Sequence, residues 1–190
     1  ERDKLLAAIR RAGRDPSEFK EVFQYGCGLG RVTNFLAESF DRVRACDASR
    51  QHLERARAHT HEIGRSNVTY LLSTLPAFGM NRQFDLWFSL FALQHYSPPV
   101  IAMILRRALT MLRPGGLAVF QCPTYAPNYQ FDIDEYLASQ VPESGLEIHF
   151  LPQSELFKVV RDAGCSIVEV VEDDTGNPQW ISNAVVVTKD

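Results

Sequence analysis

The sequence predicts an α/β fold in one domain, with a mostly parallel sheet that helices cover on both faces. Strand-like apolar segments alternate along the chain with segments whose apolar residues recur at helical spacing, which is typical of a doubly wound sheet. The chain has 190 residues, of which 45% are hydrophobic and 23% are charged. One core that buries roughly 70% of the unfolded surface is expected at this length. No repeat or linker divides the chain, so we expect a single domain over residues 1–190.

Helices and strands are expected to alternate through the N-terminal half. Leu5, Leu6 and Ile9 predict a short opening helix. Strands are expected at residues 21–25, 42–46 and 68–72. Two helices should separate them, with these inward residues: Val32, Phe35, Leu36 and Phe40 in the first, and Leu53, Ala56, Thr60 and Ile63 in the second. Ser49 is the expected N-cap of the second helix, and Gly64 suits its C-terminal end.

The C-terminal half is expected to continue the alternation and to end in an antiparallel pair. Pro98 and Pro99 suit the start of a helix, with these inward residues: Ile101, Ile104, Ala108 and Leu112. The Pro-Gly-Gly turn at residues 114–116 should end that helix. Further strands are expected at residues 84–89, 117–121, 166–171 and 181–187, and a further helix at residues 154–163. A polar turn at residues 172–178 joins the last two strands without a helix, so they should pair antiparallel.

Residues 123–149 show no regular period and are expected to form an insertion or lid over the carboxyl edge of the sheet. Four aromatic residues could line this lid, namely Tyr125, Tyr129, Phe131 and Tyr136. Asp132, Asp134 and Glu135 would make it acidic, which suits a neutral or cationic acceptor. The alternative is a short helix over residues 134–140 that packs on the core.

Composition and charge exclude several classes of function. Twenty basic and 23 acidic residues give a net charge of −3, so a nucleic-acid partner is not expected. The longest apolar stretch, around residues 86–93, is less than half of the ~18 residues that a membrane span requires. Nothing at the N-terminus resembles a signal peptide, so we expect the cytoplasm. Four cysteines (Cys27, Cys46, Cys122 and Cys165) lack metal-ligand spacing, so they are interpreted as buried thiols and no metal site is expected.

A glycine-rich turn directly follows the first expected strand. Its spacing is Gly26-x-Gly28-x-Gly30, and Arg31 stands where a dinucleotide-binding turn has its third glycine. A nicotinamide-dependent oxidoreductase is therefore disfavoured. Asp47 ends the second strand 17 residues after Gly30, where a carboxylate can accept the hydroxyls of a ribose. The alternatives are a tight turn that binds nothing and an acidic residue that only favours the helix start.

Five motifs in order resemble the class I S-adenosylmethionine-dependent methyltransferases, over nearly the whole chain. They are VFQYGCGLGR (residues 22–31), CDAS (46–49), FDLWFSLFALQH (84–95), LRPGGL (112–117) and AGC (163–165). The resemblance implies a Rossmann-like seven-stranded sheet in the order 3-2-1-4-5-7-6, with strand 7 antiparallel. It also implies S-adenosyl-L-methionine as cofactor, S-adenosyl-L-homocysteine as product, and methyl transfer to a small-molecule acceptor.

The resemblance further implies a set of cofactor-binding residues at the carboxyl ends of the strands. They are Gln24, Tyr25, Gly26, Cys27, Gly28, Gly30, Asp47, Ala48, Thr74, Leu75, Ser89 and Leu90. The family usually has a carboxylate at the positions of Gln24 and Thr74. A neutral Gln24 can still accept a hydrogen bond but supplies no charge, and the Thr74 hydroxyl binds more weakly than a carboxylate. These departures motivate an alternative function, a catalytically inactive module of the same fold that binds a cofactor or a protein partner.

His95 is the first candidate for a catalytic base, because it follows the fourth strand by six residues and its ordinary pKa suits proton transfer at neutral pH. The alternative is a histidine that hydrogen-bonds its own loop. His149 is a second candidate, at the end of the insertion. His52, His59 and His61 lie on a helix and are interpreted as surface residues without an acidic partner.

Overall fold

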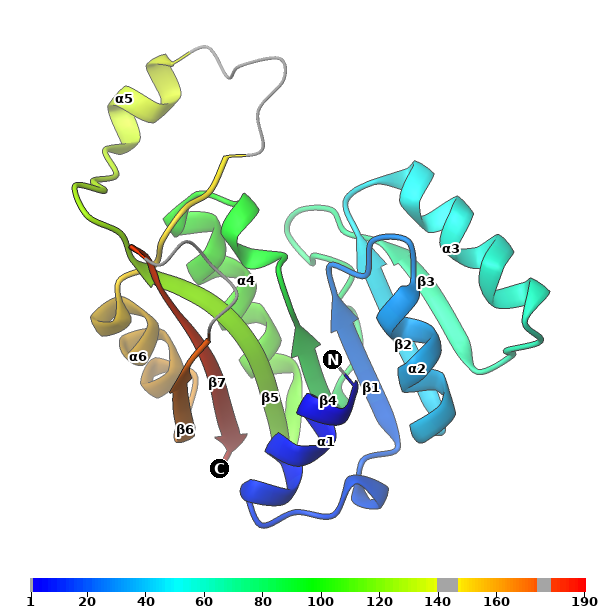
Figure 1. The fold of residues 1–190 in the computed structure, drawn as a ribbon. Helices are drawn as coiled ribbons and strands as arrows, with labels where there is room; N and C mark the ends of the chain where they lie inside the picture. Colours follow the sequence, from blue (N-terminus) through cyan, green and yellow to red (C-terminus); the bar gives the residue numbers. More distant parts are fainter. Residues whose placement is uncertain (1, 140–146, 174–178) are drawn as a thin grey trace.

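A seven-stranded sheet runs through the middle of the molecule. The computed structural model describes residues 2–139, 147–173 and 179–190 (Figure 1), so most of the turn expected at residues 172–178 lies outside the described residues. The strands are β1 (Glu21–Tyr25), β2 (Arg42–Asp47), β3 (Val68–Leu72), β4 (Phe84–Ser89), β5 (Leu112–Tyr125), β6 (Cys165–Glu172) and β7 (Ile181–Lys189). Their order is 3-2-1-4-5-7-6, and β7 is antiparallel to both β5 and β6. The expected strand order is confirmed.

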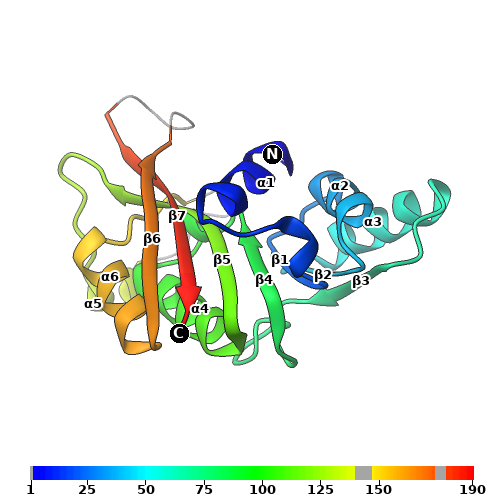
Figure 2. The same ribbon diagram turned by 90° about the horizontal axis from the view of Figure 1, so that it is seen from below.

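Helices cover both faces of this sheet. Figure 2, seen from below, shows α1 (Arg2–Arg11), α2 (Arg31–Ser39) and α3 (Arg50–Glu62) on one face, and α4 (Pro98–Met111) and α6 (Gln153–Asp162) on the other. The remaining helical segments are α5 (Ile133–Ala138), η1 (Pro16–Glu18) and η2 (Leu93–His95). None of the described helices is long and apolar enough to cross a membrane.

The central strands are apolar on both faces because each face meets helices. In β4, Leu86 packs in the cluster under α1 and α2, whereas Trp87 packs in the cluster under α4 and α6. In β5, Val119 likewise belongs to the cluster under α1 and α2, and Phe120 belongs to the cluster under α4 and α6. Such continuous apolar runs are typical of parallel strands that are buried on both sides. All four cysteines are buried free thiols, and burial raises the pKa of Cys27 and of Cys122 to about 12.

Most expected elements are confirmed, and three details are wrong. Phe35, expected to be inward, is 46% exposed, because the buried side of α2 is formed instead by Thr33, Asn34, Leu36 and Ala37. Ser49 caps α3 by accepting a hydrogen bond from the His52 amide. Ile63, expected to be inward, is 44% exposed, because α3 ends at Glu62 and Ile63 no longer follows the helical period. The fifth strand begins at Leu112 rather than after the Pro-Gly-Gly turn, since that turn forms an irregularity within the pairing of β4 and β5.

The connection from β3 to β4 leaves part of one face uncovered. Residues 73–83 are all described and form no helix. Figure 2 shows that α4 lies under β4 and β5, whereas no helix lies under β2 and β3 on that side. Arg42 and Arg44 of β2 therefore line a hollow on this face.

Candidate active site

The glycine turn lies between β1 and α2, next to the point where the strand order reverses between β1 and β4. In open α/β sheets this is where ligands bind. Gly26, Gly28 and Gly30 all have left-handed backbones, with φ of 72°, 52° and 80°. A Cβ on Gly26 would lie 2.1 Å from the Ala92 Cβ, whereas a Cβ on Gly28 would meet nothing within 4 Å. The turn is thus packed at its start and leaves open space above Gly28, which we call the glycine cradle.

Asp47 holds this turn in place. Its Oδ2 accepts a hydrogen bond from the Gly28 amide at 2.8 Å, and its Oδ1 accepts one from the Ser49 amide at 2.9 Å. A carboxylate offers about four lone-pair positions, so about two remain for the hydroxyls of a ribose. His52 Nδ1 lies 3.4 Å from Oδ1, so the expectation that this histidine has no acidic partner is wrong. The carboxylate binds the loop amides and retains capacity for a ligand.

Gln24 and Tyr25 lie beneath the turn rather than on its surface. The Gln24 Oε1 accepts a hydrogen bond from the Thr33 hydroxyl at 2.7 Å, and both side chains are buried. Tyr25 is buried against Trp87 and Tyr96, and burial, followed by the nearby Tyr96, raises its pKa. The Gln24 carbonyl therefore already has one donor within the fold.

The end of β4, where Ser89 was expected to bind the cofactor, carries two features that the sequence does not predict. The hydroxyl of Ser89 is fully buried and has no hydrogen-bond partner among the described residues. Phe91 has a positive φ of 53°, which is rare for an aromatic residue, and its amide donates to Gln121 Oε1 at 3.2 Å. Strained residues of this kind cluster at functional sites. An orphaned hydroxyl beside the open cradle fits a site that binds a polar ligand.

Ala48, Thr74 and Leu75 are exposed at the same edge of the sheet, after β2 and β3. Leu75 is 66% exposed, which is unusual for so large an apolar side chain. The Ser73 amide donates to the Asp47 carbonyl at 2.9 Å, which ties the start of this loop to the end of β2. The expected cofactor-binding residues thus divide into a buried group below the turn and an exposed group beside it.

The expected catalytic base, His95, lies at the end of η2 and is exposed. Its Nδ1 is 3.3 Å from the Glu147 carbonyl oxygen. Donation from Nδ1 to this carbonyl would leave Nε2 as the basic nitrogen. His59 and His61 are exposed on α3, as expected for surface residues. His59 Nδ1 lies 3.8 Å from Glu62 Oε2, so the expectation that it has no acidic partner is also wrong.

His149 is the centre of a cluster in the insertion. It is buried, with Nδ1 2.9 Å from Tyr129 Oη and Nε2 3.0 Å from Glu147 Oε2. The rings of Phe131 and Tyr136 pack edge-on against it, with centroids at 5.9 and 5.6 Å. Both ring nitrogens have partners, so the geometry favours a structural histidine over a base.

Three of the four expected lid aromatics gather in this cluster, and Tyr125 makes no ring contact within the part of the chain that the structure describes. The short helix α5 forms, although it buries none of its residues and so does not pack on the core. Asp132 caps α5 by accepting from the amides of Asp134 and Glu135. The lid acids therefore stabilise the helix start.

A pocket of about 500 Å³ opens between α1 and the sheet. Apolar side chains form its walls, from Leu5 and Ala8 of α1, Phe88 and Leu90 at the end of β4, and Val119, Ala184 and Val186. Its rim is charged, and Arg11 there forms a two-bond ion pair with Glu169 at 2.8 Å. Leu90 and Phe91 line this pocket, which therefore adjoins the end of β4. Among the described residues, no group of His, Cys, Asp and Glu side chains could hold a metal ion.

The strand order, the glycine cradle and the acid that holds it are those of a Rossmann-like fold, with a candidate nucleoside site at this edge of the sheet. The chain belongs to the methyltransferase domain family, which matches residues 22–116, half of the chain. S-adenosylmethionine is the cofactor of this family, and the open cradle above Gly28 fits it.

Two curated relatives support the family. The ubiquinone biosynthesis O-methyltransferase of Nitrosospira multiformis is 28% identical over 158 residues, which cover 80% of this chain and 65% of the relative. The same enzyme of Stutzerimonas stutzeri is 30% identical, with 80% and 67% covered. The chain thus spans about two thirds of the length of these relatives.

A solved structure has the same fold. The magnesium protoporphyrin IX methyltransferase of Synechocystis, with bound S-adenosylhomocysteine, matches with a TM-score of 0.71 at 18% identity. The match covers 99% of this chain and 81% of the other.

Proposed function

We propose that the chain transfers the methyl group of S-adenosylmethionine to a hydroxyl oxygen of a small, largely apolar acceptor. The observation that carries this proposal is the open cradle above Gly28, held by Asp47 beside the end of β4. The names of the curated relatives support oxygen as the acceptor atom. The apolar pocket under α1, which adjoins Leu90, is the proposed acceptor site.

Each expected cofactor-binding residue takes a role in this proposal. Asp47 binds the ribose hydroxyls with its remaining lone pairs. Ala48 and Leu75, both exposed, enclose the adenine, and Thr74 lies beside its amino group. The turn at residues 26–30 and the β4 end at residues 89–90 hold the methionine moiety. Gln24, Tyr25 and Cys27 act from below by fixing the position of the turn.

The bound cofactor supplies a methyl group that its sulfonium makes electrophilic. The chain must align the acceptor oxygen with that group and exclude water, and such alignment contributes roughly 7–11 kcal/mol. His95 Nε2 would accept the hydroxyl proton, which raises the rate by about 10²–10⁴-fold. As the oxygen–methyl bond formed, the sulfur–methyl bond would break and leave S-adenosylhomocysteine. The Glu147 carbonyl orients the ring through Nδ1.

Cofactor binding is tested by titration calorimetry with S-adenosylhomocysteine. Asp47→Asn should weaken binding at least about tenfold, because it removes a charged acceptor of ribose hydrogen bonds. The matched control is Asp41→Asn, which changes the same charge at the other end of β2, where Asp41 pairs with Lys20 at 3.7 Å. Equal affinities for wild type and Asp47→Asn would contradict the proposed site.

The acceptor site is tested with a panel of mono- and dihydroxylated aromatic compounds and radiolabelled cofactor. Ala7→Trp places a bulky ring in the pocket under α1 and should raise the acceptor KM without changing S-adenosylhomocysteine affinity. Ala58→Trp, on the exposed side of α3, is the control. An unchanged KM in Ala7→Trp would place the acceptor elsewhere.

One observation favours a second candidate, the inactive module. Gln24 supplies no carboxylate, and its carbonyl is already bound by Thr33. Saturable S-adenosylhomocysteine binding without turnover on any acceptor of the panel would favour this module. If Gln24→Glu then produced turnover, the missing charge would be the reason.

A further inference from the structure

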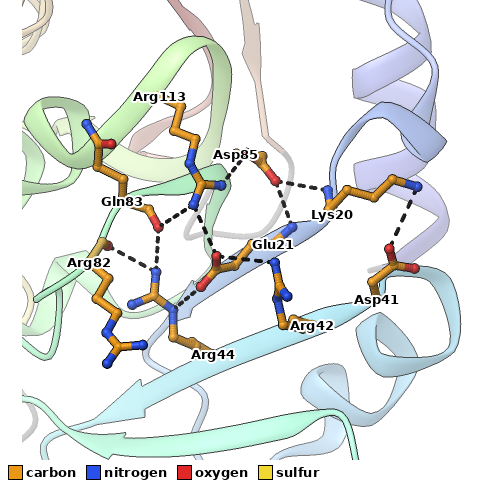
Figure 3. A network of polar contacts seen from close by, with 9 residues as sticks. All are labelled: Lys20, Glu21, Asp41, Arg42, Arg44, Arg82, Gln83, Asp85 and Arg113. Atoms are coloured by element: carbon orange, nitrogen blue, oxygen red, sulfur yellow. Dashed lines mark hydrogen bonds and ion pairs between the residues drawn. The ribbon is translucent and has the colours of Figure 1, made fainter.

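A second hollow, of about 750 Å³, lies at the opposite edge of the sheet from the glycine turn. It is formed where β2 and β3 lack a covering helix, at the amino ends of the strands (Figures 2 and 3). Its lining comprises Glu21, Arg42, Val43, Arg44, Ser66, Asn67, Thr69, Arg82, Gln83 and Arg113. Four of these residues are arginines and only one is acidic, although the whole chain is net negative.

Glu21 cannot neutralise this cluster. Figure 3 shows the side chains of Arg42, Arg44 and Arg113 converging on it. Its carboxylate oxygens lie 2.8 Å from Arg44 Nε, 3.3 Å from Arg113 Nη2 and 3.9 Å from Arg42 Nη2. Arg113 has a second partner in Asp85, at 2.6 Å. Three guanidinium groups thus share one carboxylate, and the side chains that line the hollow keep a net positive charge.

Arg44 carries the strongest sign of an unfilled site. Arg44 is only 8% exposed, and its Nη2 donates hydrogen bonds to the carbonyls of Arg82 and Gln83 at 3.0 and 2.8 Å. Its Nη1 is buried without a hydrogen-bond partner among the described residues. A buried, unsatisfied donor on a charged group is costly. Burial, and then repulsion from Arg82, Arg113 and Arg42, lowers the pKa of Arg44 against the opposing effect of Glu21.

Arg82 adds a guanidinium that is free to bind. Its side chain is exposed and has no hydrogen bond or ion pair within the described part of the chain, whereas its carbonyl is held by Arg44. The exposed Ser66 and Thr69 add hydroxyl groups to the same hollow. Planar guanidinium forks match oxyanions in a bidentate manner.

We propose that this hollow binds a small molecule that carries a phosphate or diphosphate group. The phosphate oxygens accept hydrogen bonds from Arg44 Nη1 and from the Arg82 guanidinium. The negative charge of the phosphate offsets the excess positive charge of the arginines. The site is separate from the nucleoside-binding edge, because the two lie at opposite ends of the parallel strands. Binding here therefore needs neither the cofactor nor turnover.

The test is titration calorimetry of the whole chain with inorganic pyrophosphate, at constant ionic strength set by chloride because phosphate affinities depend on salt. We expect saturable one-to-one binding. Arg82→Gln should weaken it about tenfold, since one charge-assisted interaction is lost. Arg55→Gln, an equal charge change on the exposed side of α3, should leave it unchanged. The side-chain Nε–H signal of Arg44 in an NMR spectrum should shift on binding.

Three results would overturn the proposal. They are the absence of saturable binding to wild type, an equal loss in Arg55→Gln, and affinity for citrate equal to that for pyrophosphate, which would indicate unspecific attraction of anions. S-adenosylhomocysteine affinity serves as the folding control, and it should be the same in Arg82→Gln as in wild type.

Discussion

Gly26 and Gly28 have the same kind of backbone but different surroundings. Both have positive φ, yet a Cβ on Gly26 would meet Ala92 at 2.1 Å and a Cβ on Gly28 would meet open space. Gly28→Ala should therefore cost only the left-handed strain of about 1–2 kcal/mol. Gly26→Ala should cost about 1–3 kcal/mol more, because two backbones must move apart. Urea denaturation of the two variants measures this difference in unfolding free energy. Equal losses of stability would show that the loop after β4, which carries Ala92, moves aside without cost.

Asp85 provides a residue-level test of pH dependence. Burial raises its pKa, but hydrogen bonds from Arg113 and from the Glu21 and Lys20 amides outweigh burial and lower the pKa below 3.8. A carboxyl group with a lowered folded-state pKa stabilises the fold above its unfolded pKa, and that stability is lost as the pH falls through the folded value. Asp85→Asn should thus be less stable at neutral pH, with a flatter loss of stability below about pH 4. Parallel acid-unfolding curves for the variant and wild type would contradict this assignment.

At the level of elements, residues 126–139 and 147–150 are tied together by His149. This histidine joins Tyr129 and Glu147 by hydrogen bonds, and its amide donates to the Gln94 carbonyl of η2 at 2.8 Å. His149→Phe keeps a ring but removes both side-chain bonds. Amide hydrogen exchange should then accelerate in α5 while the sheet stays protected, since α5 buries no side chain in the core. His59→Phe on α3 is the control. If His149→Phe left exchange in α5 unchanged, the side-chain hydrogen bonds of His149 would not be what holds this segment together.

The elements show what the sequence could and could not predict. The strands at residues 21–25, 68–72 and 84–89 were predicted with the observed bounds, because each is a compact apolar run beside a turn residue. The start of β5 was missed because pairing with Phe84 extends the strand back to Leu112 through the Pro-Gly-Gly turn. That pairing is a long-range contact, which local pattern does not contain.

The candidate site also contains features that the sequence could predict and features that it could not. The glycine turn and Asp47 could be predicted because both features are local in sequence and their spacing has a geometric meaning. The unpartnered hydroxyl of Ser89 and the pocket under α1 could not, since each depends on strands and helices distant in sequence. The arginines of β2 alternate along the strand, yet only the missing cover over β2 and β3 makes them line a hollow.

For the whole molecule, the two proposed sites lie at opposite ends of one sheet, which gives a prediction about linkage. A ligand that binds only the folded state at 100 times its Kd adds about 2.7 kcal/mol of stability. For a chain of this length that raises Tm by about 5–10 °C. S-adenosylhomocysteine and pyrophosphate should each produce such a shift, and Asp47→Asn and Arg82→Gln should each reduce one shift only.

Together the two ligands should add their stabilising free energies, because separate sites with no shared partners are additive to within about 0.5 kcal/mol. The measurement is differential scanning calorimetry with each ligand alone and with both. A combined free energy well below the sum would mean competition for one site, and one well above it would mean that the sheet couples its two edges. Additivity is expected because β1, β2 and β4 are buried, close-packed strands with a single arrangement. Binding at one end of these strands should therefore not change the site at the other end.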